Sequence, residues 1–245
     1  MKLKVLGSSS KGNSYLMIDE TGQALAIEAG VRFSEVQKAL NFDLSNFVGC
    51  LITHEHGDHA AFIDQFTKAA VDVYCSAGTG SKFAKSHRLH YIESGSMLKI
   101  GNFKILPFDV VHDAAQPFGY LIQHEESGNI LFLTDTFYSE FTFPGLNNII
   151  LEVNYDLEIL ERNIQSGRLH PSIRNRIVTS HMSLQTAKAL LAANNLSRVN
   201  NIILIHLSDG NSHEADFKTA IEQATGKTVI IADAGTEVLI NKTPF

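Results

Sequence analysis

The sequence contains 245 residues, of which 44% are hydrophobic and 19% charged, and its formal net charge is −6 at pH 7. This length suits one large α/β domain, so we expect a single domain over residues 1–245. The composition is ordinary for a globular chain and argues against a disordered or fibrous protein. The negative charge argues against non-specific coating of nucleic acid, which depends on many Lys and Arg side chains. Any nucleic-acid contact must be local.

The sequence shows no sign of export or membrane insertion. The N-terminal segment MKLKVLGSSSKGNSYL has too short an apolar run for a signal peptide, and no later segment approaches the length of a membrane span. Only two cysteines occur, Cys50 and Cys75, so a disulfide framework is improbable and buried free thiols are expected. We expect a cytoplasmic protein without a membrane partner.

Predicted strands and helices alternate along the first half of the chain, separated by turn-forming Gly, Ser and Asn residues. We expect strands over residues 3–7, 14–19, 24–28, 47–53, 71–75, 94–112 (a hairpin), 117–125 and 129–135. We expect helices over residues 33–40, 60–70 and 78–87. The polar segment HEHGDH therefore lies between a buried strand and a helix, and His112 and Asp135 also fall at strand ends.

The second half continues this pattern. We expect strands over residues 147–155, 201–206 and, as two short strands, 228–240, and helices over residues 157–167, 172–178, 183–195 and 212–225. Ser183 is an N-cap candidate for the third of these helices. Strands grouped toward each end with helices between them predict an α/β fold. Its two sheets pack face to face and are covered outside by helices, a four-layer αββα sandwich.

The segment His54-Glu55-His56-Gly57-Asp58-His59 carries four potential metal ligands within six residues. We expect Gly57 to let the loop turn tightly. The four side chains cannot all reach one small ion without strain, but they can serve two neighbouring ions, with His54 and His56 on one and Asp58 and His59 on the other. A solvated polar loop at a helix start is the alternative, and it does not explain three histidines at this spacing.

This HxHxDH pattern resembles the signature of the metallo-β-lactamase superfamily at every defining position, and the resemblance covers nearly the whole chain. Six segments are most similar to the YycJ-like (WalJ-like) branch: VLGSSSKGNSYLMI, THEHGDHAA, HDAAQPFGY, LTDT, EVNYD and HLSDGN. That branch is related to ribonuclease Z-type phosphodiesterases and comprises metallohydrolases with suspected DNA exonuclease activity. One position differs, because Glu28 in IEAG stands where the superfamily usually has Asp; its longer side chain can still reach the site.

The resemblance implies the remaining ligands. In the superfamily a distant His completes the first metal, an Asp bridges both metals and a late His completes the second, and His112, Asp135 and His206 occupy these positions. The expected metal ligands are thus His54, His56, Asp58, His59, His112, Asp135 and His206. Taken singly, Asp135 is better explained as a turn or capping residue, and each of the two histidines as a core-edge residue. Their joint order and their placement at strand ends favour ligands.

Two residues are predicted to act in catalysis. Asp58 is expected to orient the water between the metals and accept its proton while binding the second ion. His181, in TSHMSLQTA, is expected to begin a helix and resembles the His of the HST or HLS segment of ribonuclease Z, which lies near the reacting phosphate. We predict that His181 is a general acid or phosphate-stabilising donor and not a metal ligand. The alternative is an exposed histidine beside a helix N-cap.

Other polar segments have weaker functional interpretations. Two basic segments are candidates for binding a phosphate backbone: Lys82, Lys85, His87, Arg88 and His90 form the first, and Arg162, Arg168, His170, Arg174 and Arg176 the second. A solvated surface is favoured for the first, whereas the second, just ahead of His181, is as much a candidate contact as a solvated face. The turn containing Ser8, Ser9, Ser10, Lys11 and Asn13 is explained by a hairpin connection almost as well as by a place on the site floor, so it is assigned no catalytic role.

These features predict a hydrolase that cleaves phosphodiester bonds, a DNA exonuclease-like nuclease with a metal-bridging hydroxide as nucleophile. Two divalent metal ions are the expected cofactors, Zn²⁺ first and Mn²⁺ as the alternative, because the ligands are nitrogen and oxygen with no thiolate. Nucleic acid is the expected partner, with DNA favoured over RNA. Two alternatives stay open: hydrolysis of a small cyclic phosphodiester or other small ester or thioester, and a non-catalytic regulatory role.

Overall fold

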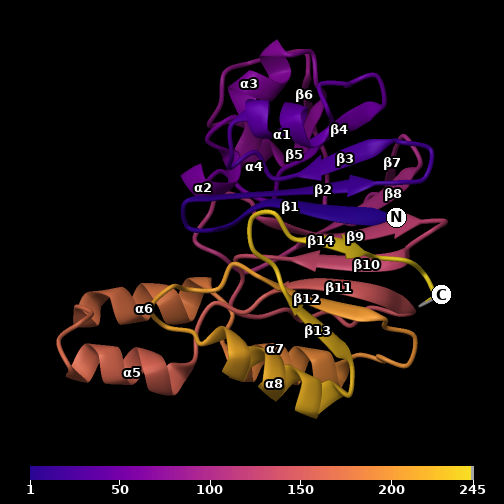
Figure 1. Cartoon of the computed structure of the whole chain (residues 1–245). Helices are drawn as coiled ribbons and strands as arrows, with labels where there is room; N and C mark the ends of the chain where they lie inside the picture. Colours follow the sequence, from indigo (N-terminus) through magenta and orange to yellow (C-terminus); the bar gives the residue numbers. More distant parts are fainter. Residues whose placement is uncertain (244–245) are drawn as a thin grey trace.

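The computed structural model describes residues 1–243, which form two β-sheets flanked by helices (Figure 1). The first sheet has the strand order β14-β1-β2-β3-β4-β5-β6. Its strands are β1 (Lys2–Ser9), β2 (Gly12–Ile18), β3 (Ala24–Ile27), β4 (Phe47–Leu51), β5 (Val73–Cys75), β6 (Leu89–Tyr91) and β14 (Glu237–Leu239). The N-terminal strands β1, β2 and β3 are antiparallel, and β3 to β6 are parallel.

The second sheet has the order β13-β12-β11-β10-β9-β8-β7. Its strands are β7 (Leu98–Ile100), β8 (Phe103–Asp109), β9 (Phe118–His124), β10 (Gly128–Leu133), β11 (Leu146–Glu152), β12 (Asn201–Ile205) and β13 (Thr228–Ile231). Strands β10 to β13 are parallel, and β9 is antiparallel to both β8 and β10. Strands β8, β10, β11 and β12 therefore all end at the same edge of the sheet.

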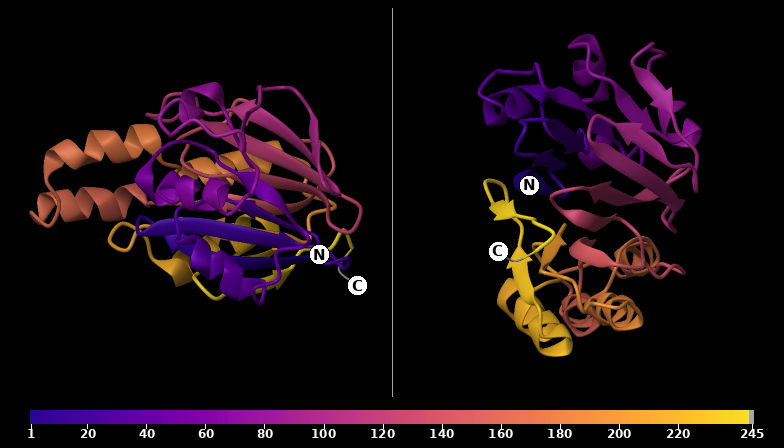
Figure 2. Two further views of the ribbon diagram at one scale, coloured as in Figure 1. Left: turned by 90° about the horizontal axis from the view of Figure 1, so that it is seen from above. Right: turned by 90° about the vertical axis from the view of Figure 1, so that its right-hand side faces the viewer.

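Helices cover the outer faces of both sheets. Those associated with the first sheet are α1 (Phe33–Ala39), α2 (Gly57–Ala60), α3 (Ile63–Lys68) and α4 (Ala77–Gly80), and those of the second half are α5 (Leu157–Gln165), α6 (Pro171–Ser180), α7 (Leu184–Ala193) and α8 (Glu214–Thr225). Helices α7 and α8 lie against the second sheet, whereas α5 and α6 form a hairpin that extends away from it (Figures 1 and 2). Ser183 caps α7 as predicted, because its hydroxyl accepts a hydrogen bond from the Thr186 N–H.

Three apolar clusters hold the layers together. The first lies between the sheets and includes Leu3, Tyr15 and Phe132; the second joins the second sheet to α7 and α8; the third joins the first sheet to α1 and α3. Strand β1 alternates between half-buried and buried residues over most of its length, whereas β11 is buried throughout because it is covered on both faces. The predicted αββα sandwich is confirmed.

Three local predictions were wrong. The expected helix over residues 60–70 is split into α2 and α3, because the Phe62 N–H bonds to the Ala29 carbonyl and not within the helix. The expected helix over residues 78–87 is reduced to α4, where the Ser81 hydroxyl donates to the Gly78 carbonyl near two helix-weakening glycines. Strand β6 was not predicted. Both cysteines are buried free thiols, as expected.

The arrangement of strands places polar loops together at one end of the sandwich. Loops that follow β4 in the first sheet meet loops that follow β8, β10 and β12 in the second. Ligand sites in sheets of this kind commonly lie beyond the carboxyl ends of the strands. Within residues 1–243, none of the helices has the length and apolarity needed to cross a membrane.

Candidate metal centre

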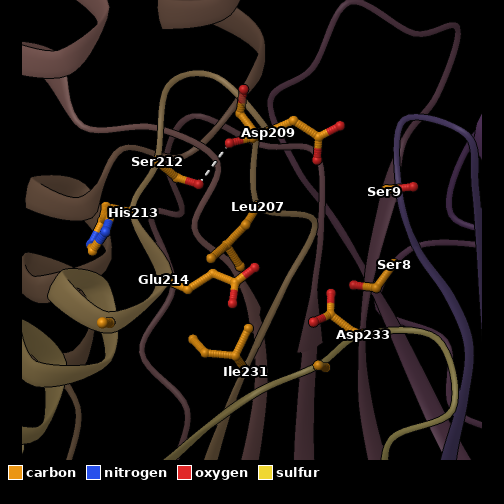
Figure 3. A pocket seen from close by; sticks show the side chains of 12 residues that line it. Ser8, Ser9, Leu207, Asp209, Ser212, His213, Glu214, Ile231 and Asp233 are labelled. Carbon is orange, nitrogen blue, oxygen red and sulfur yellow. Dashed lines mark hydrogen bonds between the residues drawn. The ribbon is translucent and has the colours of Figure 1, made fainter.

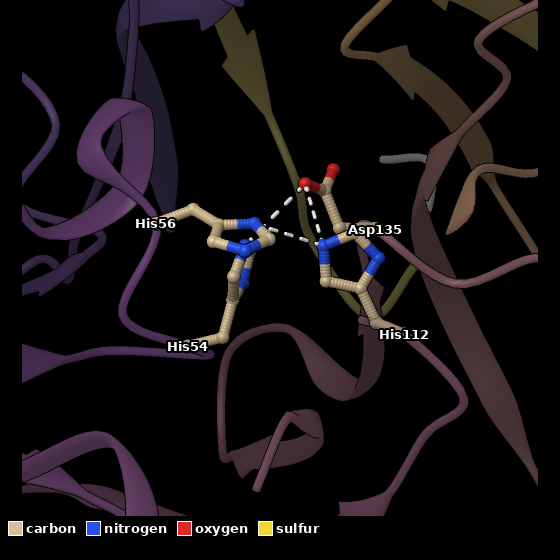
Figure 4. A group of neighbouring side chains, drawn as sticks. All are labelled: His54, His56, His112 and Asp135. Carbon is tan, nitrogen blue, oxygen red and sulfur yellow. Dashed lines mark hydrogen bonds and ion pairs between the residues drawn. The ribbon is translucent and has the colours of Figure 1, made fainter. Parts of the chain in front are cut away.

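One group of predicted ligands comprises His54, His56, His112 and Asp135. One donor atom from each lies within 4.8 Å of the others. The His112 Nε2 is 3.1 Å from the His56 Nδ1, and the His54 Nε2 is 3.4 Å from the Asp135 Oδ2. Figure 4 shows the three imidazole rings converging near the Asp135 carboxylate. These residues come from loops after β4, β8 and β10, so both sheets contribute to the group.

A second group comprises Asp58, His59, Asp135 and His206. The His59 Nε2 lies 3.2 Å from the Asp135 Oδ2 and 3.4 Å from the Asp58 Oδ2, and the His206 Nε2 lies 3.2 Å from the same Asp58 oxygen. Asp135 belongs to both groups. The structure thus brings all seven residues predicted as ligands into two adjoining clusters that share one carboxylate.

The ring nitrogens of the first group suit metal binding. The Nδ1 of His112 lies 2.8 Å from the Ser180 carbonyl, to which it donates, so the lone pair is on the Nε2 that faces the cluster. The Nδ1 of His54 lies 2.9 Å from the Thr53 hydroxyl, while its buried Nε2 has no hydrogen-bond partner. Burial, together with the charge of His59, holds the pKa of His54 well below its usual value, which keeps this ring neutral. A cation would give the unpaired nitrogen a partner.

The charge of the cluster also suits cations. Three carboxylates are buried around it: Glu28, Asp135 and Glu152. Within residues 1–243, each ion pair that these carboxylates form is with a histidine. Burial opposes protonation of His206, yet the charge of Asp135 and the hydrogen bonds that the ring donates to Asp58 and Glu152 raise its pKa to about 10. Because buried carboxylates are costly without positive charge, divalent ions fit this donor set.

Glu28 reaches the cluster although the superfamily usually has the shorter Asp at this position. Its Oε1 accepts a 2.6 Å hydrogen bond from the Thr53 hydroxyl and lies 3.4 Å from the His59 Nδ1. The carboxylate therefore orients His59 from behind, and through Thr53 it also supports His54. Burial raises the pKa of Glu28 in spite of the hydrogen bonds from His59 and Thr53.

His181 lies against the cluster, but its local structure differs from the prediction. It caps the carboxyl end of α6 and does not begin a helix. Its Nδ1 is 2.6 Å from the Glu152 Oε1, and its side chain is 19% exposed. Burial opposes protonation, but the charge of Glu152 and its hydrogen bond raise the pKa of His181. His181 is therefore held by a buried carboxylate and is not an exposed residue beside a helix cap.

Glu152 itself was not predicted as a site residue. It is fully buried at the end of β11, and its Oε1 also lies 3.3 Å from the His206 Nδ1. The signal that marked Asp135 was present here too, since an acidic residue ends an apolar strand, and Glu152 stands in the segment EVNYD. The structure assigns it a position behind both His181 and His206.

The turn between β1 and β2 contacts the cluster, although the sequence assigned it no catalytic role. The Asn13 Nδ2 lies 3.2 Å from the His59 Nε2 and donates to the Asp58 backbone carbonyl at 3.3 Å. The Ser8 hydroxyl accepts a 3.0 Å hydrogen bond from the His206 N–H. The turn forms part of the site floor and positions three predicted ligands.

Backbone conformation at the site differs from the expectation in one respect. Gly57 has no positive φ, and a Cβ there would meet no atom within 4 Å, so the prediction that it is needed for a tight turn was wrong. Positive φ angles occur instead at Glu28 (71°), Asp135 (44°) and His206 (53°). Such angles are uncommon for non-glycine residues and are found where surrounding contacts enforce them, often at functional sites.

Two hollows adjoin the cluster and differ in charge. One, of about 600 Å³, is lined by His181, His206 and the α6 residues Ile173 and Ile177, and it carries both Arg168 and Asp209. The other, of about 460 Å³, lies between the β1–β2 turn and the segment after His206, and it carries Asp209, Glu214 and Asp233 (Figure 3). Asp209 lines both hollows, but the first also carries an Arg, whereas the second carries two further carboxylates and no Lys or Arg, so the first suits a phosphate-containing ligand better.

The two basic segments have different surroundings. In the first, Arg88 and His90 pair with Asp72 at 3.2 and 2.8 Å, beside β6 at the edge of the first sheet. In the second, Arg168 lines the hollow next to His181, whereas Arg174 pairs with Glu161 of the neighbouring helix. The second segment is thus the one that adjoins the cluster.

Comparison with known proteins identifies the family. The sequence model of the β-lactamase superfamily domain matches residues 29–207, a range that includes all seven clustered residues. The chain belongs to this superfamily. With its fold and its relatives, the chain is a metallo-β-lactamase-fold hydrolase whose His and Asp clusters fit divalent metal ions.

Relatives in this superfamily align along most of the chain. Exodeoxyribonuclease WalJ of Streptococcus pneumoniae is 28% identical over 239 residues, covering 91% of this chain and 87% of WalJ. Exodeoxyribonuclease YycJ of Bacillus anthracis is 27% identical over 242 residues, covering 91% and 88%. The crystal structure of YhfI from Bacillus subtilis shares the fold, with a TM-score of 0.73 at 17% identity and coverage of 97% and 99%. Human short-form tRNase Z has a TM-score of 0.63 at 14% identity, with coverage of 98% and 99%.

Proposed function

We propose that this superfamily member is a two-metal phosphodiesterase that acts on DNA as an exonuclease. In this proposal His54, His56, His112 and Asp135 hold one ion, and Asp58, His59, Asp135 and His206 hold the other. The observation that carries it is the shared carboxylate. The Asp135 Oδ2 lies 3.4, 3.2 and 3.6 Å from His54, His59 and His112, and its Oδ1 lies 3.5 Å from His206. Zn²⁺ is our first choice and Mn²⁺ the second, on the chemistry of the donors.

The protein's own residues have distinct roles in the proposed reaction. Two bound divalent ions lower the pKa of water and offset negative charge on phosphate oxygens. Asp58 is half-buried and held by Asn13 and His206, so its carboxylate is positioned to accept a proton from the attacking water. His181 is engaged by Glu152 through Nδ1, which leaves Nε2 for the substrate; there it donates a proton to the leaving oxygen or a hydrogen bond to phosphate.

DNA is proposed as the substrate on two grounds. The relatives that align over most of the chain are named exodeoxyribonucleases. In addition, the hollow beside His181 carries Arg168, whose guanidinium matches phosphate geometry, against one carboxylate, whereas the hollow beside the β1–β2 turn carries three carboxylates and no Lys or Arg. A strand that enters past α6 therefore meets a favourable charge, and one that enters past Asp233 does not.

The proposal is tested with purified, metal-reconstituted protein on bis-p-nitrophenyl phosphate and on end-labelled single- and double-stranded DNA and RNA. We expect Zn²⁺- or Mn²⁺-dependent release of mononucleotides from DNA and loss of activity in Asp135→Ala, with less metal bound in elemental analysis. Asp216→Ala removes an exposed carboxylate on α8 that lies outside both groups and lines neither hollow, and it should keep wild-type turnover of the small substrate. Two bound metals without cleavage of DNA would contradict the nuclease assignment, and turnover of the small ester alone would favour a small phosphodiester.

The role of His181 has a separate test. His181→Ala should lower kcat by about 10²- to 10⁴-fold, the usual contribution of general acid catalysis, while metal content stays unchanged. A leaving group that needs no proton, such as p-nitrophenolate, should be less affected than a DNA linkage. Equal turnover of DNA by the variant and the wild type would exclude the acid role.

A further inference from the structure

A patch of exposed aromatic side chains lies on the loop that follows Asp135. Phe137, Tyr138 and Phe141 are 37%, 48% and 48% exposed, and all three stand between β10 and β11. Isolated exposed aromatics are ordinary, but three within five residues, next to a shared carboxylate, are of functional interest. We call these three residues the aromatic platform.

Hydrogen bonds tie the platform to the candidate metal centre. The Thr136 N–H donates to the Glu152 Oε2 at 3.3 Å. The Thr136 hydroxyl accepts from the Val111 N–H at 3.1 Å and lies 2.7 Å from the Tyr138 carbonyl, to which it donates. Since Val111 precedes His112 and Thr136 follows Asp135, the backbone of the platform is held to two of the clustered residues.

One ring of the platform packs on a buried aromatic side chain, and the other two lie beside each other. Phe141 packs edge-on against the buried Phe108, with centroids 5.8 Å apart, and Phe137 and Tyr138 are neighbours at 6.5 Å. An aromatic ring loses little conformational entropy when it is bound, because few torsions must be fixed. Supported and exposed rings of this kind are suited to stack against a flat ligand.

The charge of the loop indicates which part of a nucleic acid it contacts. Residues 136–141 include Glu140 and contain no Lys or Arg. The loop therefore offers nothing to neutralise phosphates, and it repels them weakly through Glu140. The cation that lines a hollow at the cluster, Arg168, belongs to the α5–α6 hairpin. An aromatic surface without cations beside a phosphodiester site favours contact with bases, whose faces are uncharged.

We propose that Phe137, Tyr138 and Phe141 stack unpaired bases of a single DNA strand next to the bond that is cut. This inference rests on the proposed function and names the form of its substrate. In a duplex each base face is already covered by its neighbours, so the platform requires a single strand or a frayed end. Stacking on aromatic side chains is tolerant of sequence, because every base has such a face.

The test measures binding separately from cleavage. A fluorescein-labelled, phosphorothioate-linked single strand is titrated with metal-loaded protein and followed by anisotropy. Phe137→Ala with Tyr138→Ala should weaken binding by about 10- to 100-fold, the range for loss of one or two stacked bases. Phe42→Ala is the matched control: Phe42 is 70% exposed but lies between α1 and β4, at the end of the sandwich opposite the cluster, and should bind like the wild type. Metal content and thermal unfolding check that the double variant is folded.

A second substrate shows whether the rings contact bases. The wild type should bind a strand with consecutive abasic sites about as weakly as the double variant binds the normal strand, and the variant should lose little more on the abasic strand. Equal losses on both strands, or unchanged binding, would overturn the proposal. So would conversion of a dimer to a monomer without any effect on DNA, which would make the platform an interface between copies. If the wild type binds as expected but cleaves no DNA, the proposed function fails while the platform stands.

Discussion

Glu152 is the buried residue on which the orientation of His181 depends. Its Oε1 accepts from the His181 Nδ1 at 2.6 Å and also lies 3.3 Å from the His206 Nδ1. Glu152→Gln keeps the shape but removes the charge, so His181 loses the partner that holds its ring and favours its proton. We expect kcat to fall about 10- to 100-fold, the range for residues that orient catalytic or metal-binding groups. Steady-state kinetics on DNA with parallel elemental analysis would measure this.

The pair His181→Ala and Glu152→Gln forms a double-mutant cycle. If Glu152 acts through His181, the double variant should be no slower than His181→Ala alone. Additive losses with reduced metal content would instead show that Glu152 acts mainly through His206. Because the Thr136 N–H also donates to Glu152, the Glu152→Gln substitution can disturb the loop after β10. Thermal unfolding of the variants and the wild type separates a general loss of structure from a local one.

Hydrogen bonds such as those of Glu152 limit how many site residues could be predicted from the sequence. The clustering of His54, His56, Asp58 and His59 was predictable because four potential metal ligands lie within six residues of sequence. Glu152, Asn13 and Thr53 form hydrogen bonds with segments that are distant in the chain, and such bonds have no periodicity. They become visible only when the strands are assembled, because polar residues at strand ends are equally common as turn residues.

At the scale of elements, the close contact between Gly30, which follows β3, and helix α2 positions Asp58 and His59 of the second group. A Cβ on Gly30 would lie 1.7 Å from the Asp58 carbonyl oxygen and 2.6 Å from the Asn13 nitrogen. Gly30→Ala must therefore push α2 away, and we expect it to lower the free energy of unfolding by about 3 kcal/mol and to weaken one of two metal sites. Chemical denaturation and metal titration would measure both effects.

Gly57→Ala is the matched control for Gly30→Ala. Gly57 begins α2 between His56 and Asp58, but a Cβ there meets nothing within 4 Å. Because Ala has the higher helix propensity, by roughly 1 kcal/mol, stability should be unchanged or slightly raised. Similar losses in both variants would mean that this loop tolerates no substitution, and that the close approach at Gly30 is not the cause.

The α5–α6 hairpin is the element whose charge we connect with the substrate. Arg168→Ala should raise KM for DNA and reduce the slope of log K against log salt by about 1, as expected for one lost phosphate contact. Arg162 lies on α5 of the same hairpin and hydrogen-bonds the Glu158 carbonyl, so Arg162→Ala controls for net charge. Equal salt slopes for the two variants would show that Arg168 of the hairpin does not contact a DNA phosphate.

Helices and strands were more predictable than single contacts. The elements that were predicted wrongly show the physical reasons. Most strands were predicted because strands buried between layers consist of apolar residues, as in β11, which is buried throughout. Only Leu89 is buried among the three residues of β6, so no alternation marks this edge strand. The break between α2 and α3 depends on the bond from Phe62 to Ala29, a tertiary contact that helix periodicity does not contain.

At the scale of the whole molecule, the candidate metal centre joins the two sheets at one end of the sandwich. The predicted ligands after β4 belong to the first sheet, and those after β8, β10 and β12 to the second. The inter-sheet apolar cluster, which includes Leu3 and Phe132, holds the rest of the interface without any metal. Metal removal should therefore loosen one end of the molecule while its secondary structure persists.

Chelation of the metals should lower Tm by roughly 10 °C. Metals bound at about a thousand times their Kd add about 4 kcal/mol to stability, and in a chain of this size each kcal/mol corresponds to about 2–4 °C. Without the ions, Glu28, Asp135 and Glu152 remain buried with histidines as their only ion-pair partners among residues 1–243, which lowers stability further.

Scanning calorimetry with and without chelator, and far-UV circular dichroism at 25 °C, would measure the two parts of the prediction. Asp135→Ala, with its shared ligand removed, should show little response to chelator. Loss of the circular dichroism signal on chelation would contradict this account, because the apolar cluster between the sheets would then be insufficient to hold the fold.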